Sequence, residues 1–277
     1  MLDFVVEQLS SRIDKVKEMA VATRAAPGPE AIHQLRVSIR RLTEAVRALE
    51  DWVGARKAAK LRERLRPVMK AAGETRNLDI ARDLCVEAGA DPVAATLAAM
   101  RIEAAHRLIE ELLVLDLAKL RVPCQPNAAV PAPRVLAAAI AAKLIRKYWE
   151  AGDQAARPEA DWARLHGFRL ATKHLRYTLE LFAPAFGPGA QTKLGTLRDV
   201  QTHLGKVNDC AIARGFELIA ADAALDEWLA ERQRAEHHKF LAAWNRESPK
   251  RGVWLRYFCG SAAGSLKLNP HESDRRH

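Results

Sequence analysis

Basic side chains recur at helical spacing between residues 32 and 49 of this sequence. One side of a helix that turns by about 100° per residue would carry His33, Arg36, Arg40 and Arg47. At about 1.5 Å per residue, this row extends over roughly 21 Å. Arginine and lysine donate hydrogen bonds to phosphate oxygens, arginine through a bidentate fork. A row of this length suits a linear polyanion better than a single phosphate.

A second row of the same kind lies 133 positions later and consists of His166, Arg169 and Lys173. A basic stripe on a single helix is usually a solvated surface. Repetition of the same stripe in the same register favours a binding role instead. If the two helices face each other, their rows line a groove or channel of one sign, and its low-dielectric walls focus the electric field.

The histidines of the two rows have a structural alternative, because a lone histidine on a helix most often packs or caps. In a basic groove, His33 and His166 would instead join the anion site and gain charge as the pH falls through about 6.5. His174 aligns with Arg41 and extends the second row.

Each basic row lies beside an apolar stripe that predicts burial of the neighbouring side of its helix. The first stripe consists of Ile32, Leu35, Ile39, Leu42, Val46 and Leu49. The second consists of Leu165, Phe168, Thr172, Leu175, Leu179 and Phe182. These patterns predict helices over residues 29–52 and 161–182, with Pro29 in the first turn of one, and Pro184 together with Gly187, Pro188 and Gly189 closing the other.

The rest of the sequence predicts an all-α fold, because no stretch alternates with a period of two for long enough to form a strand. Further helices are expected at residues 2–20, 55–72, 77–87, 91–120, 135–149, 190–204, 207–221, 225–245 and 254–259. Gly73 is expected to end one of these helices, and Pro67 to kink it.

An internal duplication extends beyond the two basic helices. Residues 65–82 align with residues 197–214 at a shift of 132 positions. In each segment a glycine precedes polar residues that we interpret as helix caps, namely Asn77, Asp79, Asn208 and Asp209. The duplication predicts two helical bundles related by a pseudo-twofold axis.

The most proline-dense stretch of the chain divides the two halves. We therefore expect an N-terminal bundle over residues 1–122, a linker over 123–133, a C-terminal bundle over 134–260 and a polar tail over 261–277.

Composition is that of a globular protein with an anionic partner. The 277 residues are 49% hydrophobic and 28% charged, with a net charge of +10. The four cysteines show neither a CxxC pair nor zinc spacing, which indicates reduced thiols. No signal peptide is recognisable, and the longest apolar runs fall far short of the ~20 residues that span a bilayer. We expect a cytoplasmic protein with no membrane partner.

Four motifs resemble the CHAD domain, the conserved-histidine α-helical domain. HQLRVSIRRL and HGFRLATKHLRY are similar to its paired signatures, and GETRNLDIA and GKVNDCAIA to the elements that follow them. Asn77 departs from the aspartate usual in the family. The resemblance implies two four-helix bundles around a basic central pore that binds inorganic polyphosphate.

The same resemblance implies which residues contact polyphosphate. The signature positions are His33, Arg36, Arg40, Arg41, His166, Arg169, Lys173, His174, Arg176 and Tyr177. Further contacts are expected from Arg66, Arg76, Arg198 and Lys206, together with Arg47 from the first basic row.

Three other functions fit parts of the sequence. A histidine phosphotransfer module would use His33, but two equivalent histidines followed by several cations fit binding better. A di-metal carboxylate bundle would use the spacings Glu30 to His33 and Glu103 to His106, but partner glutamates at matching positions are not apparent. Nucleic-acid binding would follow from the charge, but the sequence shows no helix-turn-helix spacing.

The sequence thus favours binding of inorganic polyphosphate without catalysis, cofactor or metal. No glycine-rich phosphate loop and no Ser/His/Asp order are found. Association with polyphosphate granules in the cytoplasm would follow from such binding, and nucleic acid is not expected as a specific partner.

Overall fold

The fold of the chain is all-α, as the sequence predicts. The computed structural model describes residues 2–122, 124, 133–157 and 161–260, and within them every regular element is helical. The proline-rich linker, apart from Cys124 and Pro133, and the polar tail lie outside the described residues. The expected domain boundaries therefore stay a prediction.

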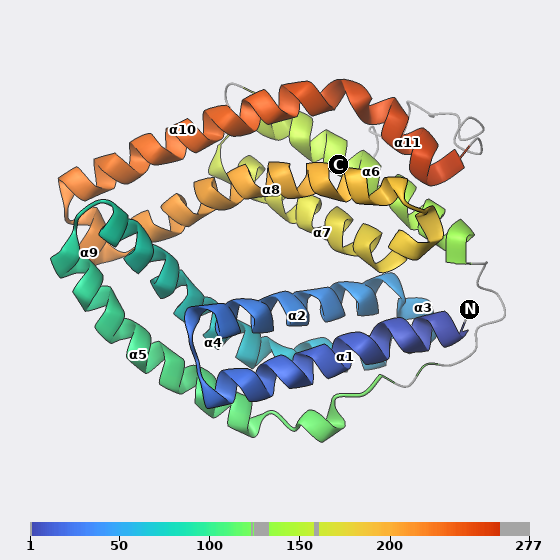
Figure 1. The fold of residues 1–277 in the computed structure, drawn as a ribbon, viewed down its shortest axis with the longest axis horizontal. Helices are drawn as coiled ribbons and strands as arrows, with labels where there is room; N and C mark the ends of the chain where they lie inside the picture. Colours follow the sequence, from blue (N-terminus) through green and yellow to red (C-terminus); the bar gives the residue numbers. More distant parts are fainter. Residues whose placement is uncertain (1, 123, 125–132, 158–160, 261–277) are drawn as a thin grey trace, which may run out of the picture.

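The helices of the two halves lie in two groups, one above the other in Figure 1. The first half contains α1 (Leu2–Ala25), α2 (Pro29–Ala48), α3 (Glu50–Val53), α4 (Ala55–Glu87), α5 (Asp91–Val114) and the 3-10 turn η1 (Leu117–Lys119). The second half contains α6 (Pro133–Ala155), α7 (Trp162–Phe186), α8 (Gly189–Arg214), α9 (Glu217–Ala220), α10 (Ala223–Glu247), η2 (Ser248–Lys250) and α11 (Arg251–Cys259).

The helices of the two halves begin at similar spacings along the chain. Helix α2 begins at residue 29 and α7 at residue 162, a difference of 133. Helix α5 begins at residue 91 and α10 at residue 223, a difference of 132. These starts agree with the shifts of the sequence alignment. A pseudo-twofold axis relating the halves stays a prediction.

Two helix ends predicted from glycines are wrong. Helix α4 runs without interruption through Gly73, and α8 through Gly205. A glycine in a helix interior costs only about 1 kcal/mol relative to alanine. Burial of apolar side chains on both sides of the glycine, such as Val68 and Leu78 in α4, offsets that cost.

The predicted caps are wrong for the same reason, since all four residues lie inside α4 or α8. Asp79 is instead fully buried, and its Oδ1 accepts a hydrogen bond from Nε of Arg101 at 2.7 Å. Pro184 likewise lies within α7, which ends at Gly187, where φ is +77°. The expected kink at Pro67 stays a prediction.

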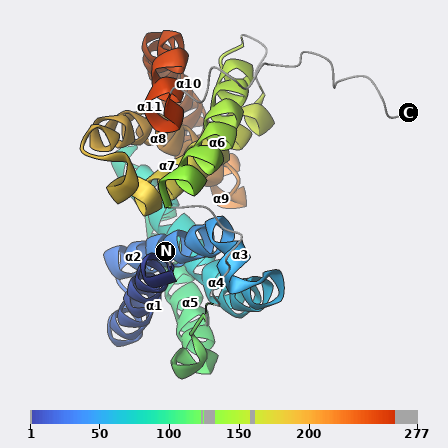
Figure 2. The same cartoon turned by 90° about the vertical axis from the view of Figure 1, so that its right-hand side faces the viewer.

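Three clusters of buried apolar side chains hold the helices together. One lies mostly in the first half, but Ala137, Leu181 and Phe182 of the second half also belong to it, and another lies in the second half. The third also joins the halves, because Leu84 and Leu97 of α4 and α5 belong to it together with Ile219 and Leu229 of α9 and α10. The halves also meet where α2 packs against α7 and where α4 packs against α8. Figure 2 shows the two groups of helices end-on, one above the other.

The buried pair of Asp79 and Arg101 generates a stability prediction. Asp79→Ala should lower the free energy of unfolding by about 3–5 kcal/mol, because it leaves the mostly buried guanidinium of Arg101 without its counter-charge. Chemical denaturation followed by circular dichroism measures this change. Glu18→Ala is the matched control, since it breaks an exposed pair with Lys15 and should cost less than about 1 kcal/mol. Equal small losses in both variants would contradict the prediction.

Candidate functional site

A cleft of about 470 Å³ lies between the two halves, and we call it the central cleft. Helices α2, α4, α7 and α8 all contribute to its walls. From the first half it is lined by His33, Arg36, Arg40, Arg41 and Arg76. From the second half it is lined by Arg169, Lys173, Arg176, Tyr177 and Arg198. Side chains of both basic rows therefore face one shared cavity.

The apolar stripes fix the direction of the basic rows. Ile32, Leu35 and Ile39 of α2 are at most 2% exposed, and Phe168 and Leu175 of α7 are fully buried. Since the apolar side of each helix packs into the core of its own half, the neighbouring basic side is turned toward the central cleft.

Arg36 reaches across the cleft wall to α4. Its Nη1 lies 3.5 Å from the backbone oxygen of Met69, and a Cβ atom at Gly73 would lie only 2.7 Å from the same nitrogen. Gly73 thus leaves the space that this guanidinium occupies. Burial, followed by the charges of Arg40 and neighbouring arginines, lowers the pKa of Arg36 to about 10, so it stays charged at neutral pH.

Tyr177 holds two of the arginines of the central cleft. Its hydroxyl forms a hydrogen bond with the side chain of Arg40, which opposes the lowering of the Arg40 pKa by burial. The guanidinium of Arg176 lies over its ring, 4.5 Å from the centroid. Tyr177 is only 6% exposed, so it fixes these cations through packed contacts.

Lys173 is the most strongly perturbed cation of the central cleft. Burial lowers its pKa to about 6, and the charges of Arg169, Arg40 and Arg36 act in the same direction. The carboxylate of Asp209 opposes the shift. The folded protein therefore holds Lys173 largely neutral at pH 7.

The histidines titrate below the pH expected from the sequence. Partial desolvation, and then the charge of Arg76, lower the pKa of His33 below its usual 6.5. Desolvation and the charge of Arg169 lower that of His166. His33 is exposed at the cleft, whereas His166 does not line it and contacts Trp162, with 5.7 Å between ring centroids.

Asp209 is a residue of the cleft that sequence reasoning interpreted only as a cap. It lines the central cleft, and burial raises the pKa of its carboxyl group, against the opposing effects of Asn208 and of three nearby cations. The signal was present in the alignment, because Asp209 takes the place of Asn77 in the repeat. This carboxylate supplies counter-charge inside the empty cleft.

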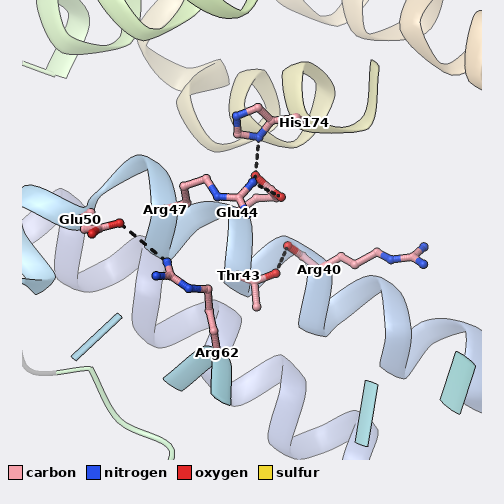
Figure 3. Close-up of polar contacts among 7 residues, drawn as sticks. All are labelled: Arg40, Thr43, Glu44, Arg47, Glu50, Arg62 and His174. Atoms are coloured by element: carbon pink, nitrogen blue, oxygen red, sulfur yellow. Dashed lines mark hydrogen bonds and ion pairs between the residues drawn. The ribbon is translucent and has the colours of Figure 1, made fainter. Parts of the chain in front are cut away.

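Two other predicted residues lie in a neighbouring cleft. Arg47 and Arg66 line a cleft of about 860 Å³ between α2 and α4, which we call the α2–α4 cleft. Arg36 and Arg40 line both this cleft and the central cleft, so the two adjoin. Figure 3 shows Arg40 extended from α2, away from the ion pairs formed by Arg47.

A third cleft continues the basic surface on the other side of α2. This α1–α2 cleft has a volume of about 380 Å³ and shares Arg41 and Arg198 with the central cleft. Arg12 and Lys15 of α1 also line it. Three adjoining clefts therefore pass around α2.

Acidic partners engage several of the predicted cations. His174 Nδ1 contacts the carboxylate of Glu44, which also pairs with Arg47 at 3.1 Å (Figure 3). Lys206 Nζ lies 3.6 Å from Oε1 of Glu236, outside the central cleft. His174 and Lys206 are thus predicted site residues that the structure places in ion pairs instead of in the cleft wall.

Glu180 pairs with two cations of the central cleft. Its carboxylate lies 3.4 Å from Nε of Arg41 and 3.3 Å from Nη1 of Arg176. An anion that enters there competes with Glu180 for both guanidinium groups.

Sequence reasoning missed the cations that α1 and α4 contribute to the adjoining clefts. Arg62, Arg66 and Lys70 line the α2–α4 cleft at steps of four residues, which places them on one side of α4. That spacing is visible in the sequence, but of these three residues only Arg66 is among the predicted polyphosphate contacts. On α1, only Arg12 and Lys15 line the α1–α2 cleft among the described residues. Two cations do not form a row that stands out in the sequence.

The sequence of residues 7–218 matches the CHAD domain family. This chain belongs to that family. The crystal structure of the CHAD domain from the plant Ricinus communis is similar, with a TM-score of 0.64 and 20% identity over 94% of this chain and 91% of that chain. PptA from Streptomyces chartreusis is similar with a TM-score of 0.56 and 18% identity over 90% of this chain and 98% of that chain. Both likenesses show the fold. A search of curated proteins gave no match.

Two further observations concern membranes and metals. None of the described helices is both long and apolar enough to cross a membrane. Among the described residues, no group of three or more histidine, cysteine, aspartate and glutamate side chains could hold a metal ion. Glu103, one member of the spacing considered for a di-metal site, pairs instead with Arg107 at 3.9 Å.

The lowered pKa of Lys173 predicts how stability depends on pH. Above about pH 6 the folded protein has released this proton, whereas the unfolded chain keeps it up to about pH 10.4. The unfolded state then binds more protons, so stability should rise with pH from about 6 to 9, by up to about 1.4 kcal/mol per pH unit. Urea denaturation at a series of pH values measures this slope.

Lys173→Met should flatten that slope, because the variant carries no titrating group at this position. Lys143→Met, at an exposed position on α6, should leave the slope unchanged. A slope that survives in Lys173→Met would contradict the assignment.

Proposed function

We propose that this protein binds inorganic polyphosphate in the central cleft and does not transform it. The observation that carries the proposal is the unbalanced charge of the cleft. Eight arginine and lysine side chains from both halves line it, whereas Asp209 supplies the one carboxylate among its lining residues and Glu180 pairs with two of the arginines from beside it. A polyanion relieves their mutual repulsion and meets donors from several directions.

The adjoining clefts support an extended ligand. Arg36 and Arg40 continue the cationic surface into the α2–α4 cleft, and Arg41 and Arg198 continue it into the α1–α2 cleft. A single phosphate or a nucleotide would occupy only part of this path. A linear chain of phosphates has the repeating charge that such a path requires, and polyphosphate is the ligand implied by the family to which the chain belongs.

The arrangement of donors favours binding over phosphotransfer. His33 is exposed, so a partner protein could reach it, but Arg36, Arg40 and Arg76 all affect its pKa. A phosphorylated histidine in this position would be held by these cations instead of being passed on. Incubation with a phosphorylated histidine kinase domain should leave no acid-labile label on His33, and stable labelling of His33 would favour phosphotransfer.

Reversal of one cation from each basic row should abolish most binding. Arg36→Glu/Arg169→Glu removes two charge-assisted contacts, each worth about 1.5–3 kcal/mol, and adds repulsion to the ligand. The affinity for polyphosphate should fall by more than about a hundredfold, as measured by isothermal titration calorimetry.

Lys143→Glu/Lys147→Glu is the matched control for that experiment. It makes the same change in net charge on the exposed side of α6, and its affinity should stay within a few-fold of wild type. Affinity in both variants should weaken with salt. Wild-type affinity in the arginine double variant, or preference for duplex DNA at fixed salt, would count against the proposal.

The space that Gly73 leaves for Arg36 predicts that a substitution there weakens binding without lowering stability. Gly73→Ala should leave stability unchanged or raise it by up to about 1 kcal/mol, because alanine is the better helix former. The new methyl group displaces the guanidinium of Arg36, which lies 2.7 Å from the Cβ position. Polyphosphate affinity should therefore drop by about tenfold while the melting temperature does not fall.

Gly195→Ala is the control for Gly73→Ala. Gly195 lies inside α8 and does not line the central cleft, and no atom lies within 4 Å of a Cβ built there. Its affinity should stay near that of wild type. An equal loss of affinity in both variants would show that space for Arg36 is not the reason.

A further inference from the structure

A separate group of cations lies on the outer side of the first half. Lys57, Lys60 and Arg64 of α4 and Lys119 and Arg121 at and after η1 surround a hollow of about 290 Å³. We call it the α4–η1 hollow. Leu61 forms its floor and is 4% exposed. No acidic residue among the described residues lines the hollow.

The α4–η1 hollow lies on the side of α4 away from the proposed polyphosphate path. Arg66 lines the α2–α4 cleft and Arg64 lines the hollow. At about 100° per residue, these two positions are about 200° apart around the helix. The hollow also shares no lining residue with the other three clefts. It is therefore a distinct site and not an extension of the path around α2.

The two walls of the hollow are tied together by defined contacts. Nη1 of Arg64 donates to the backbone oxygen of Lys119 at 2.9 Å. Asp116 accepts hydrogen bonds from the backbone nitrogens of Ala118 and Lys119 and so fixes the start of η1. Asp116 also pairs with Nζ of Lys119 at 2.9 Å, which leaves the other cations of the hollow to face one another. The four remaining like charges around so small a space repel each other unless an anion lies between them.

We propose that the α4–η1 hollow is a second polyphosphate site, so that one molecule holds two separate segments of polyphosphate. The identity of the ligand rests on the proposed function of the central cleft. The shape of the hollow favours a thin chain, because its cations surround a recess and do not form a flat surface of the kind that a duplex covers. The apolar floor is buried, so the hollow offers no side chain for insertion into a membrane.

Two sites on opposite sides of α4 give the protein a valence of two. A long polyphosphate chain that reaches both sites on different molecules connects those molecules. Linked binding of this kind raises the overall avidity without any new contact. The protein would then gather polyphosphate into larger assemblies instead of only coating single chains.

A comparison of the binding sites for a short phosphate ligand in the wild type and in its variants tests the proposal. With sodium tripolyphosphate as the probe, isothermal titration calorimetry should show two classes of site in the wild type, one in the path around α2 and one in the hollow. Arg36→Glu/Arg169→Glu should lose the first class, Lys57→Glu/Lys60→Glu the second, and the quadruple variant both. Lys143→Glu/Lys147→Glu should keep both sites. Circular dichroism verifies that each variant is folded.

Long-chain polyphosphate gives a second readout. Dynamic light scattering should show large assemblies with the wild type and their loss in Lys57→Glu/Lys60→Glu, although that variant still binds through the central cleft. Assemblies that persist in this variant would overturn the proposal.

The possible failures point to different conclusions. If the arginine double variant binds no tripolyphosphate, the hollow is not a site and the central cleft alone carries the function. Absence of binding in the wild type would instead refute the proposed function. If duplex DNA or phosphatidylglycerol vesicles bind the hollow more tightly than tripolyphosphate, and Lys57→Glu/Lys60→Glu removes that binding, the second site belongs to another class of ligand.

Discussion

Repulsion among like charges in the central cleft is the constraint on which the rest of the structure depends. The cations there are partly removed from water, and this burial lowers the pKa of Arg36 to about 10 and that of Lys173 to about 6. The folded protein reduces the cost by holding Lys173 largely neutral and by placing Asp209 in the cleft wall. A polyanion in the cleft would make both features unnecessary, because its negative charge offsets the cations and favours the protonated form of Lys173.

A rigid scaffold must hold these charges together against their repulsion. The apolar cluster that joins α4 and α5 to α9 and α10 fixes one side, and the packing of α2 against α7 fixes the other. Ion pairs from Glu44 to His174 and from Glu180 to Arg41 connect the same two helices. The proposed binding surface is thus assembled from both halves without a ligand, which would reduce the cost of ordering it.

Much of the fold could be predicted from periodicity, whereas breaks in the helices could not. The apolar stripes of α2 and α7 located both helices and their buried sides. The helix breaks expected at Gly73, at Pro184 and between residues 204 and 207 do not occur, because local propensity ignores the burial that carries a helix through a weak position. For the same reason, the sequence around Asp209 indicated a helix cap, although long-range packing places this residue in the central cleft.

The sequence by itself determined the helical class, the family and the two basic rows, because these depend on residue type and spacing along one chain. Only the tertiary structure decided which cations share a cavity. It brought Arg36 beside Gly73 and Lys173 of α7 near Arg40 of α2, and it paired His174 and Lys206 with carboxylates instead. The reason is that a helical pattern fixes the direction of a side chain around its own axis, while the partner across a cleft depends on how separate helices pack.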